Sequence, residues 1–160
     1  MELIVNSEND TLELGKKIAG QLDIGDIVIL TGELGSGKTK LTEGVLSYFG
    51  LSEEVSSPTF TIVNEYDTPN LKIFHFDLYR LADIDEFSAI GGEEYFEKGA
   101  CIIEWGEMVE DYIPDRYLKL EFKTTDENQR VINITKVGDI NIEIWYLYQS
   151  QWKWWFLWKF

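Results

Sequence analysis

Gly32 to Thr39 reads GELGSGKT and stands between the unbroken run Ile27–Thr31, rich in β-branched residues, and the amphipathic segment Lys38–Phe49. The run before the loop is typical of a strand buried on both faces of a sheet. The segment after it carries apolar residues at a spacing of four and is followed by Gly50, a residue suited to a helix C-terminal cap. A buried strand, a glycine-rich loop and a helix in this order predict a P-loop, and with it an α/β fold around a central sheet.

The residues of this loop suit the binding of phosphate groups. Its glycines allow consecutive backbone N–H groups to turn inward around phosphate oxygens, while the helix behind it presents its positive N-terminal end. The Lys38 ammonium would reach the β- and γ-phosphates, and the Thr39 hydroxyl is placed to coordinate Mg²⁺. The expected contacts to a nucleotide are therefore Gly32, Glu33, Leu34, Gly35, Ser36, Gly37, Lys38 and Thr39.

Two acidic residues are candidates for the carboxylate that a P-loop needs at the end of a neighbouring strand, where it holds the metal ion or orients water. Asp77 follows the run Ile73–Phe76, and Glu104 follows Cys101–Ile103. Because a carboxylate directly after buried apolar residues has no packing role, both are candidate catalytic and metal-binding residues, beside Lys38. For each acid taken alone, a solvated strand end remains an alternative interpretation.

The rest of the chain supplies further elements of one domain. Strands are also expected at Leu3–Val5, Thr61–Tyr66, Leu71–Asp77, Ala100–Glu104, Tyr117–Lys123 and Val131–Thr135, and helices at Thr11–Leu22, Ala82–Ile90 and Glu93–Phe96. Asp67–Asn70 has turn residues between two of these strands, which predicts a hairpin and hence a mixed sheet. The sequence therefore predicts a single P-loop NTPase-like α/β domain over residues 1–144, with a mixed central sheet flanked by helices.

Residues 145–160 differ from the rest of the chain. They read WYLYQSQWKWWFLWKF and hold every tryptophan except Trp105. Such a segment either packs on the domain as a strand or helix, or is a terminus whose sequence has drifted or shifted frame. Contact with a membrane interface or a partner is the other interpretation. The conformation of this aromatic tail is left unassigned.

Composition and charge exclude several classes of protein. The 160 residues include 14 basic and 29 acidic side chains, a net charge of -15, and no basic stretch long enough to follow a phosphate backbone. A nucleic acid is therefore expected to be reached only through a partner protein. Cys101 is the one cysteine, which fits a reducing cytoplasm, and we expect neither a signal peptide nor a membrane span.

Other motifs bear on which nucleotide is bound and what is done with it. The D-x-x-G and N-K-x-D motifs of Ras-like GTPases do not occur, which disfavours GTP. A small-molecule kinase would need an arginine-bearing lid, but the arginines of this chain are few and widely separated. Hydrolysis therefore fits better than kinase chemistry. The Ser56–Thr61 segment is either an ordinary polar loop or a γ-phosphate switch, and His75 is interpreted as a structural residue. Arg130 is either a solvated side chain or one that stacks on a base.

Four segments, TGELGSGKTKLTEGV, SSPTFTIVNEY, IFHFDLYRL and CIIEWGE, occur here in an order and spacing that resemble the TsaE (YjeE) family over residues 1 to 136. Members of that family are ATPase components of the bacterial machinery that makes threonylcarbamoyladenosine in tRNA. The resemblance implies a cytoplasmic, Mg²⁺-dependent ATPase that works with the TsaD and TsaB proteins and meets tRNA only through that complex. No membrane is expected as a partner. It further implies that the Ser57–Thr61 loop, with Thr59 and Thr61, acts as a switch.

The same resemblance assigns roles to individual residues. Thr39 and Glu104 would hold Mg²⁺, while Asp77 would orient or deprotonate water or share the metal through one. Trp105 matches the family's E-W pair and would contact nucleotide or partner. Candidates around the base and the adjoining phosphates are Glu8, Thr11, Lys40 and Arg130, of which Lys40 departs from the small hydroxyl residue that many relatives carry. The alternative to an ATPase is a nucleotide-sensing binding module that needs no hydrolysis.

Overall fold

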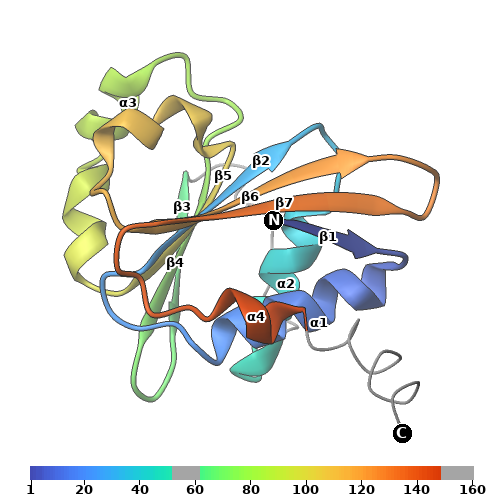
Figure 1. Cartoon of the computed structure of the whole chain (residues 1–160). Helices are drawn as coiled ribbons and strands as arrows, with labels where there is room; N and C mark the ends of the chain where they lie inside the picture. The colour runs from blue at the N-terminus through green and yellow to red at the C-terminus, as the bar shows by residue number, and fades with distance from the viewer. Residues whose placement is uncertain (52–61, 149–160) are drawn as a thin grey trace, which may run out of the picture.

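The structure, a computed structural model, describes residues 1–51 and 62–148 and consists of one sheet between layers of helices (Figure 1). The strands are β1 Glu2–Val5, β2 Ile27–Gly32, β3 Val63–Asp67, β4 Lys72–Asp77, β5 Ala100–Glu104, β6 Tyr117–Thr124 and β7 Arg130–Val137. The α-helices are α1 Glu8–Ala19, α2 Lys38–Tyr48, α3 Ile84–Ala89 and α4 Ile144–Leu147, and the 3₁₀ helices are η2 Gly92–Glu97, η3 Gly106–Met108 and η4 Glu110–Tyr112. The predicted fold class is confirmed.

The sheet is mixed, and its centre is parallel. The strand order is β1-β7-β6-β2-β5-β4-β3, in which β2 pairs in parallel with both β5 and β6, and β5 pairs in parallel with β4. The outer strands β1, β7 and β3 pair antiparallel with their neighbours. The carboxyl ends of β2, β4, β5 and β6 therefore lie at the same edge of the sheet, and this is where ligands bind in open α/β sheets.

Strand β2 is buried on both faces, as its apolar run predicts. Val28 and Leu30 belong to the core beneath α1, α2 and α4, while Ile27 and Ile29 pack with Phe87 of α3 in a second cluster on the other face. All four β2 side chains are at most 1% exposed. The strand that leads into the glycine-rich loop is thus fixed from both sides.

The helix ends differ slightly from the predicted ones. Helix α1 begins at Glu8 because the Ser7 side chain caps it by accepting from the Asp10 N–H, and it ends at Ala19, three residues before the expected Leu22. Helix α2 ends at Tyr48, and Gly50 follows it in the left-handed conformation, as predicted. Of the two short helices expected after the hairpin, the second is a 3₁₀ helix rather than an α-helix.

The first residues of the aromatic tail are part of the folded domain. Helix α4 covers Ile144–Leu147, and Leu147 and Tyr148 are buried in the core beneath the sheet. The remainder of the tail, residues 149–160, lies outside the described residues. Within residues 1–51 and 62–148, none of the helices is long and apolar enough to cross a membrane.

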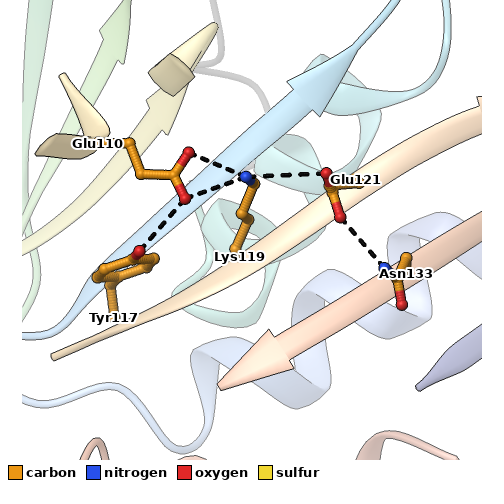
Figure 2. A network of polar contacts seen from close by, with 5 residues as sticks. All are labelled: Glu110, Tyr117, Lys119, Glu121 and Asn133. Atoms are coloured by element: carbon orange, nitrogen blue, oxygen red, sulfur yellow. Dashed lines mark hydrogen bonds and ion pairs between the residues drawn. The ribbon is translucent and has the colours of Figure 1, made fainter. Parts of the chain in front are cut away.

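A polar network ties the segment after β5 to the sheet (Figure 2). Glu110 of η4 accepts two contacts from Lys119 of β6, at 2.9 and 3.0 Å, and one from the Tyr117 hydroxyl at 3.2 Å. Lys119 also lies 3.7 Å from Glu121, whose other oxygen accepts from Asn133 of β7. The charged groups on this face of β6 are therefore paired with one another, and η4 is held against the sheet.

Candidate functional site

The glycine-rich loop joins the carboxyl end of β2 to the first turn of α2, as the sequence predicts. Gly32, Gly35 and Gly37 have φ angles of 138°, 77° and 115°, a region that side-chain-bearing residues rarely adopt. At Gly32 a Cβ atom would also lie 2.6 Å from the backbone oxygen of Phe122. Glycine is therefore required for the path of this loop, which turns its backbone toward the N-terminus of α2.

The Lys38 side chain folds back into the loop that precedes it. Its Nζ donates to the carbonyl oxygens of Gly32, at 2.5 Å, and Glu33, at 2.9 Å, and lies 4.0 Å from the centre of the Trp105 ring. Burial lowers the pKa of this ammonium, while nearby carboxylates, Glu104 first among them, act in the opposite direction. Lys38 is 4% exposed, so the positive charge is concentrated inside the loop.

The two predicted strand-end carboxylates lie side by side next to the loop. Asp77 of β4 and Glu104 of β5 are register partners, and Thr39 of α2 donates its hydroxyl to Glu104 Oε1 at 3.0 Å. Glu104 is 3% exposed, whereas Asp77 is half-buried and accepts from the Tyr79 N–H. The structure thus brings a hydroxyl and two carboxylates together at the carboxyl edge of the sheet.

This set of oxygen donors has the chemistry that Mg²⁺ prefers. No group of three or more His, Cys, Asp and Glu side chains suited to holding a metal ion occurs in residues 1–51 and 62–148. Mg²⁺ commonly takes one or two protein ligands and completes its coordination with substrate phosphates and water. Thr39, Glu104 and Asp77 therefore fit a magnesium ion that arrives with a nucleoside triphosphate.

His75 contacts this group, which the sequence interpretation did not foresee. The imidazole is fully buried in β4, and its Nε2 forms a short contact with Glu104 Oε2. A histidine two residues before Asp77 is on the same face of the strand as that acid. Its neighbour across the sheet depends on the β4–β5 register, which the sequence alone does not supply.

Trp105 has an unusual backbone conformation directly after Glu104. Its φ of 60° makes it the one side-chain-bearing residue with positive φ in residues 1–51 and 62–148. Its ring lies beside Lys38 and 4.9 Å from the Tyr79 ring, and its backbone N–H donates to the Leu30 carbonyl. Such strained conformations concentrate at functional sites.

A second group of predicted residues surrounds a pocket of about 120 Å³ on the amino-terminal side of α1. Its lining residues are Ser7, Glu8, Thr11, Gly35, Ser36, Gly37, Lys40, Glu127, Asn128 and Arg130. The candidates for binding a base, which are far apart in the sequence, thus meet at the loop, whereas Asp77, Glu104 and Trp105 are not part of this pocket.

Three charged side chains of the pocket, Glu8, Lys40 and Arg130, already have partners. Lys40 lies 2.6 Å from Glu43 and 3.8 Å from Glu8, and the hydrogen bond with Glu43 is the main cause that raises its pKa. Arg130 Nη1 donates to carbonyl oxygens of the turn before β7, which curls the guanidinium over that turn. Sequence reasoning missed Ser7 as a lining residue.

Not every candidate for nucleotide contact is placed. Thr59 and Thr61, with the rest of the predicted switch loop, lie outside the described residues. The Leu34 side chain is 76% exposed and Glu33 is also exposed, and neither residue lines the pocket. Missed lining residues also include Glu127 and Asn128, for which the turn-like composition between two late strands was the available signal.

Comparison with known proteins identifies similar chains. A family model described as "Threonylcarbamoyl adenosine biosynthesis protein TsaE" matches residues 5–132. A protein of Bacillus subtilis named "tRNA threonylcarbamoyladenosine biosynthesis protein TsaE" is 38% identical over 136 residues, 84% of each chain. A protein of the same name from Rickettsia bellii is 36% identical over 135 residues, which are 84% of this chain and 94% of the relative. The crystal structure of Bacillus subtilis YdiB superposes with a TM-score of 0.70 at 27% identity, covering 94% of this chain and 92% of that one.

Proposed function

The chain belongs to the TsaE family, and from this premise we propose that it binds ATP with Mg²⁺ at the GELGSGKT loop and hydrolyses it slowly. Hydrolysis would support the threonylcarbamoyladenosine modification of tRNA, the process that the names of its relatives give. We further propose that the chain acts in the cytoplasm with TsaD and TsaB proteins, which would hold the tRNA.

The observation that carries this proposal is the hydrogen bond from the Thr39 hydroxyl to Glu104 at 3.0 Å, between residues 65 positions apart. A P-loop hydroxyl and a strand-end carboxylate are the protein ligands that P-loop NTPases use for Mg²⁺. The register pairing of Asp77 with Glu104 adds a second, more accessible carboxylate beside them. That position suits a residue that orients water toward the γ-phosphate.

Residues in the loop and beside it then have roles in binding or chemistry. The Lys38 ammonium, now bonded to two loop carbonyls, would exchange them for β- and γ-phosphate oxygens. Bound Mg²⁺, held by Thr39 and Glu104, would neutralise charge on the phosphates. Asp77 would orient the attacking water and accept its proton, and the Trp105 ring would shield Lys38 from solvent.

The pocket at the start of α1 supports the assignment of residues around the base. Glu8 and Thr11 of α1 and Arg130 of β7 reach it from two separate segments and adjoin Gly35–Gly37, so a nucleotide with its phosphates in the loop would extend into it. Breaking the Arg130 contacts to turn carbonyls would free the guanidinium to stack on the base. ATP is favoured over GTP because the guanine-reading motif is missing from the sequence.

The first prediction concerns turnover. With TsaD and TsaB present, we expect Glu104→Gln and Asp77→Asn each to reduce ATP hydrolysis by about 100-fold or more, because metal binding and proton acceptance each contribute at that scale. Glu121→Gln, which removes a carboxylate from the network on the other face, is the matched control and should hydrolyse ATP like the parent chain. Phosphate release is the measurement.

Three outcomes would change the proposal. Rapid hydrolysis by the isolated chain with no stimulation by TsaD–TsaB would reject the dependence on partners. If both acid variants bind ATP, lose hydrolysis and still support repeated rounds of tRNA modification, the chain is a nucleotide-sensing module. Transfer of labelled phosphate to a metabolite would make it a kinase.

A further inference from the structure

The Glu104 carboxylate is held at both of its oxygens. Oε1 accepts from the Thr39 hydroxyl at 3.0 Å, and Oε2 meets His75 Nε2 in a shorter contact. Glu104 is 3% exposed and His75 is fully buried. A carboxylate withdrawn from water to this extent needs hydrogen-bond donors, and the His75 ring is its donor from the interior of the sheet.

The surroundings of the ring determine where its proton lies. The other ring nitrogen, Nδ1, is buried and has no hydrogen-bond partner among the described residues. A proton on Nδ1 would therefore be a buried, unaccepted N–H group, whereas a proton on Nε2 is accepted by Glu104. The environment selects the tautomer that donates to the carboxylate.

The strand register explains why His75 acts on Glu104 alone. In the parallel pairing of β4 with β5, His75 is opposite Ile102 and Asp77 is opposite Glu104. His75 and Glu104 are thus diagonal neighbours on one face, and the ring lies one residue pair further from the loop than the carboxylates. It is too deep to meet a nucleotide, so any influence on the site passes through Glu104.

We propose that His75 is a positioning residue that fixes the Glu104 carboxylate toward Thr39 and so sets the affinity of the site for Mg²⁺. This inference rests on the proposed Mg²⁺-ATP function. Hydrogen-bond partners of metal-binding side chains typically contribute 10- to 100-fold to metal affinity or activity. The histidine that sequence reasoning treated as structural is then part of the site, although it touches neither nucleotide nor metal.

Two substitutions at position 75 separate positioning from packing. In His75→Gln the side-chain amide can place an N–H close to the position of Nε2, whereas in His75→Leu the volume is largely filled and no donor remains. We expect His75→Leu to raise the Mg²⁺ concentration for half-maximal ATP hydrolysis, with TsaD–TsaB and saturating ATP, at least tenfold. His75→Gln should restore most of that loss, and ATP affinity in EDTA should be the same in all three chains.

A purely structural role gives a different result. Both variants would then lower the unfolding temperature, while the Mg²⁺ requirement would stay within twofold of the parent chain. Equal Mg²⁺ requirements for His75→Gln and His75→Leu would likewise overturn the proposal, because only one of them keeps a donor.

A second measurement tests the contact without nucleotide or metal. His75 is the only histidine in the chain, so the ¹⁵N-labelled protein gives one set of imidazole NMR signals. We expect the ring proton on Nε2, slow exchange with water, and an upfield shift of this proton in Glu104→Gln, where the acceptor loses its charge. A proton on Nδ1, or a signal unmoved by Glu104→Gln, would reject the positioning role.

Failure of the parent chain to bind ATP with Mg²⁺ would instead reject the proposed function. The NMR result would still show whether His75 donates to Glu104.

Discussion

At the scale of single residues, the site is organised around groups that satisfy one another. Lys38 donates hydrogen bonds to carbonyl oxygens of its own loop, and Glu104 is hydrogen-bonded to Thr39 and His75. Buried polar groups need such partners, since an unpaired one costs about 1–3 kcal/mol. Entry of a nucleotide therefore requires the exchange of Lys38 contacts, while Glu104 can keep both of its own.

The glycines of the loop allow a prediction at this scale. Gly35 and Gly32 both have positive φ, but a Cβ at Gly35 meets nothing within 4 Å, whereas one at Gly32 lies 2.6 Å from the Phe122 backbone. Gly35→Ala should cost about 1–2 kcal/mol through backbone strain alone. Gly32→Ala should cost a further ~1–3 kcal/mol through overpacking. Urea unfolding of both variants is the measurement, and equal losses would contradict the assigned close contact.

At the scale of elements, α2 carries Lys38 and Thr39 and is positioned by its packing on α1. Two glycines allow the helices to approach closely. A Cβ at Gly44 of α2 would lie 2.2 Å from the Leu12 carbonyl oxygen, and one at Gly15 of α1 would lie 2.3 Å from the Leu41 oxygen. The helix–helix distance therefore determines where the loop and Thr39 stand relative to Glu104.

A substitution at this contact should affect both stability and binding. We expect Gly44→Ala to lower the free energy of unfolding by about 1–3 kcal/mol, because the helices must separate. It should also weaken ATP binding, because α2 moves away from β5. Gly20→Ala, at the end of α1 with φ of −64° and ordinary contact to Tyr48, is the control and should change stability by less than about 1 kcal/mol. If Gly44→Ala and Gly20→Ala have the same unfolding temperature and the same ATP affinity, the close α1–α2 contact at Gly44 is contradicted.

The same elements show how far the sequence predicts the fold and the site. The β2 run and the loop predict a strand, turn and helix because burial on both faces and glycine at positive φ leave a clear pattern. The register of β4 with β5 leaves no pattern in the sequence, since parallel pairing joins segments that are distant in the chain. Asp77 and Glu104 could be predicted individually as strand-end acids, but the His75–Glu104 contact could not.

At the scale of the whole molecule, residues that are far apart in the sequence converge on one loop. The pocket draws Glu8 from the start of the chain and Arg130 from near its end, while Glu104 comes from the centre of the sheet. The chain as a whole carries a net charge of -15. Partners with basic faces are therefore the ones that electrostatics favours.

The most direct test of the central claim is calorimetric titration of the full chain with ATP and with GTP, each in Mg²⁺ and in EDTA. Thr39→Val, which keeps the shape of the side chain and removes its hydroxyl, is the matched variant. We predict that ATP binds more tightly than GTP, that removal of Mg²⁺ weakens ATP binding at least tenfold, and that Thr39→Val loses this dependence on Mg²⁺. Equal affinity for ATP with and without Mg²⁺, or binding of GTP as tight as that of ATP, would contradict a magnesium–ATP site at Thr39 and Glu104.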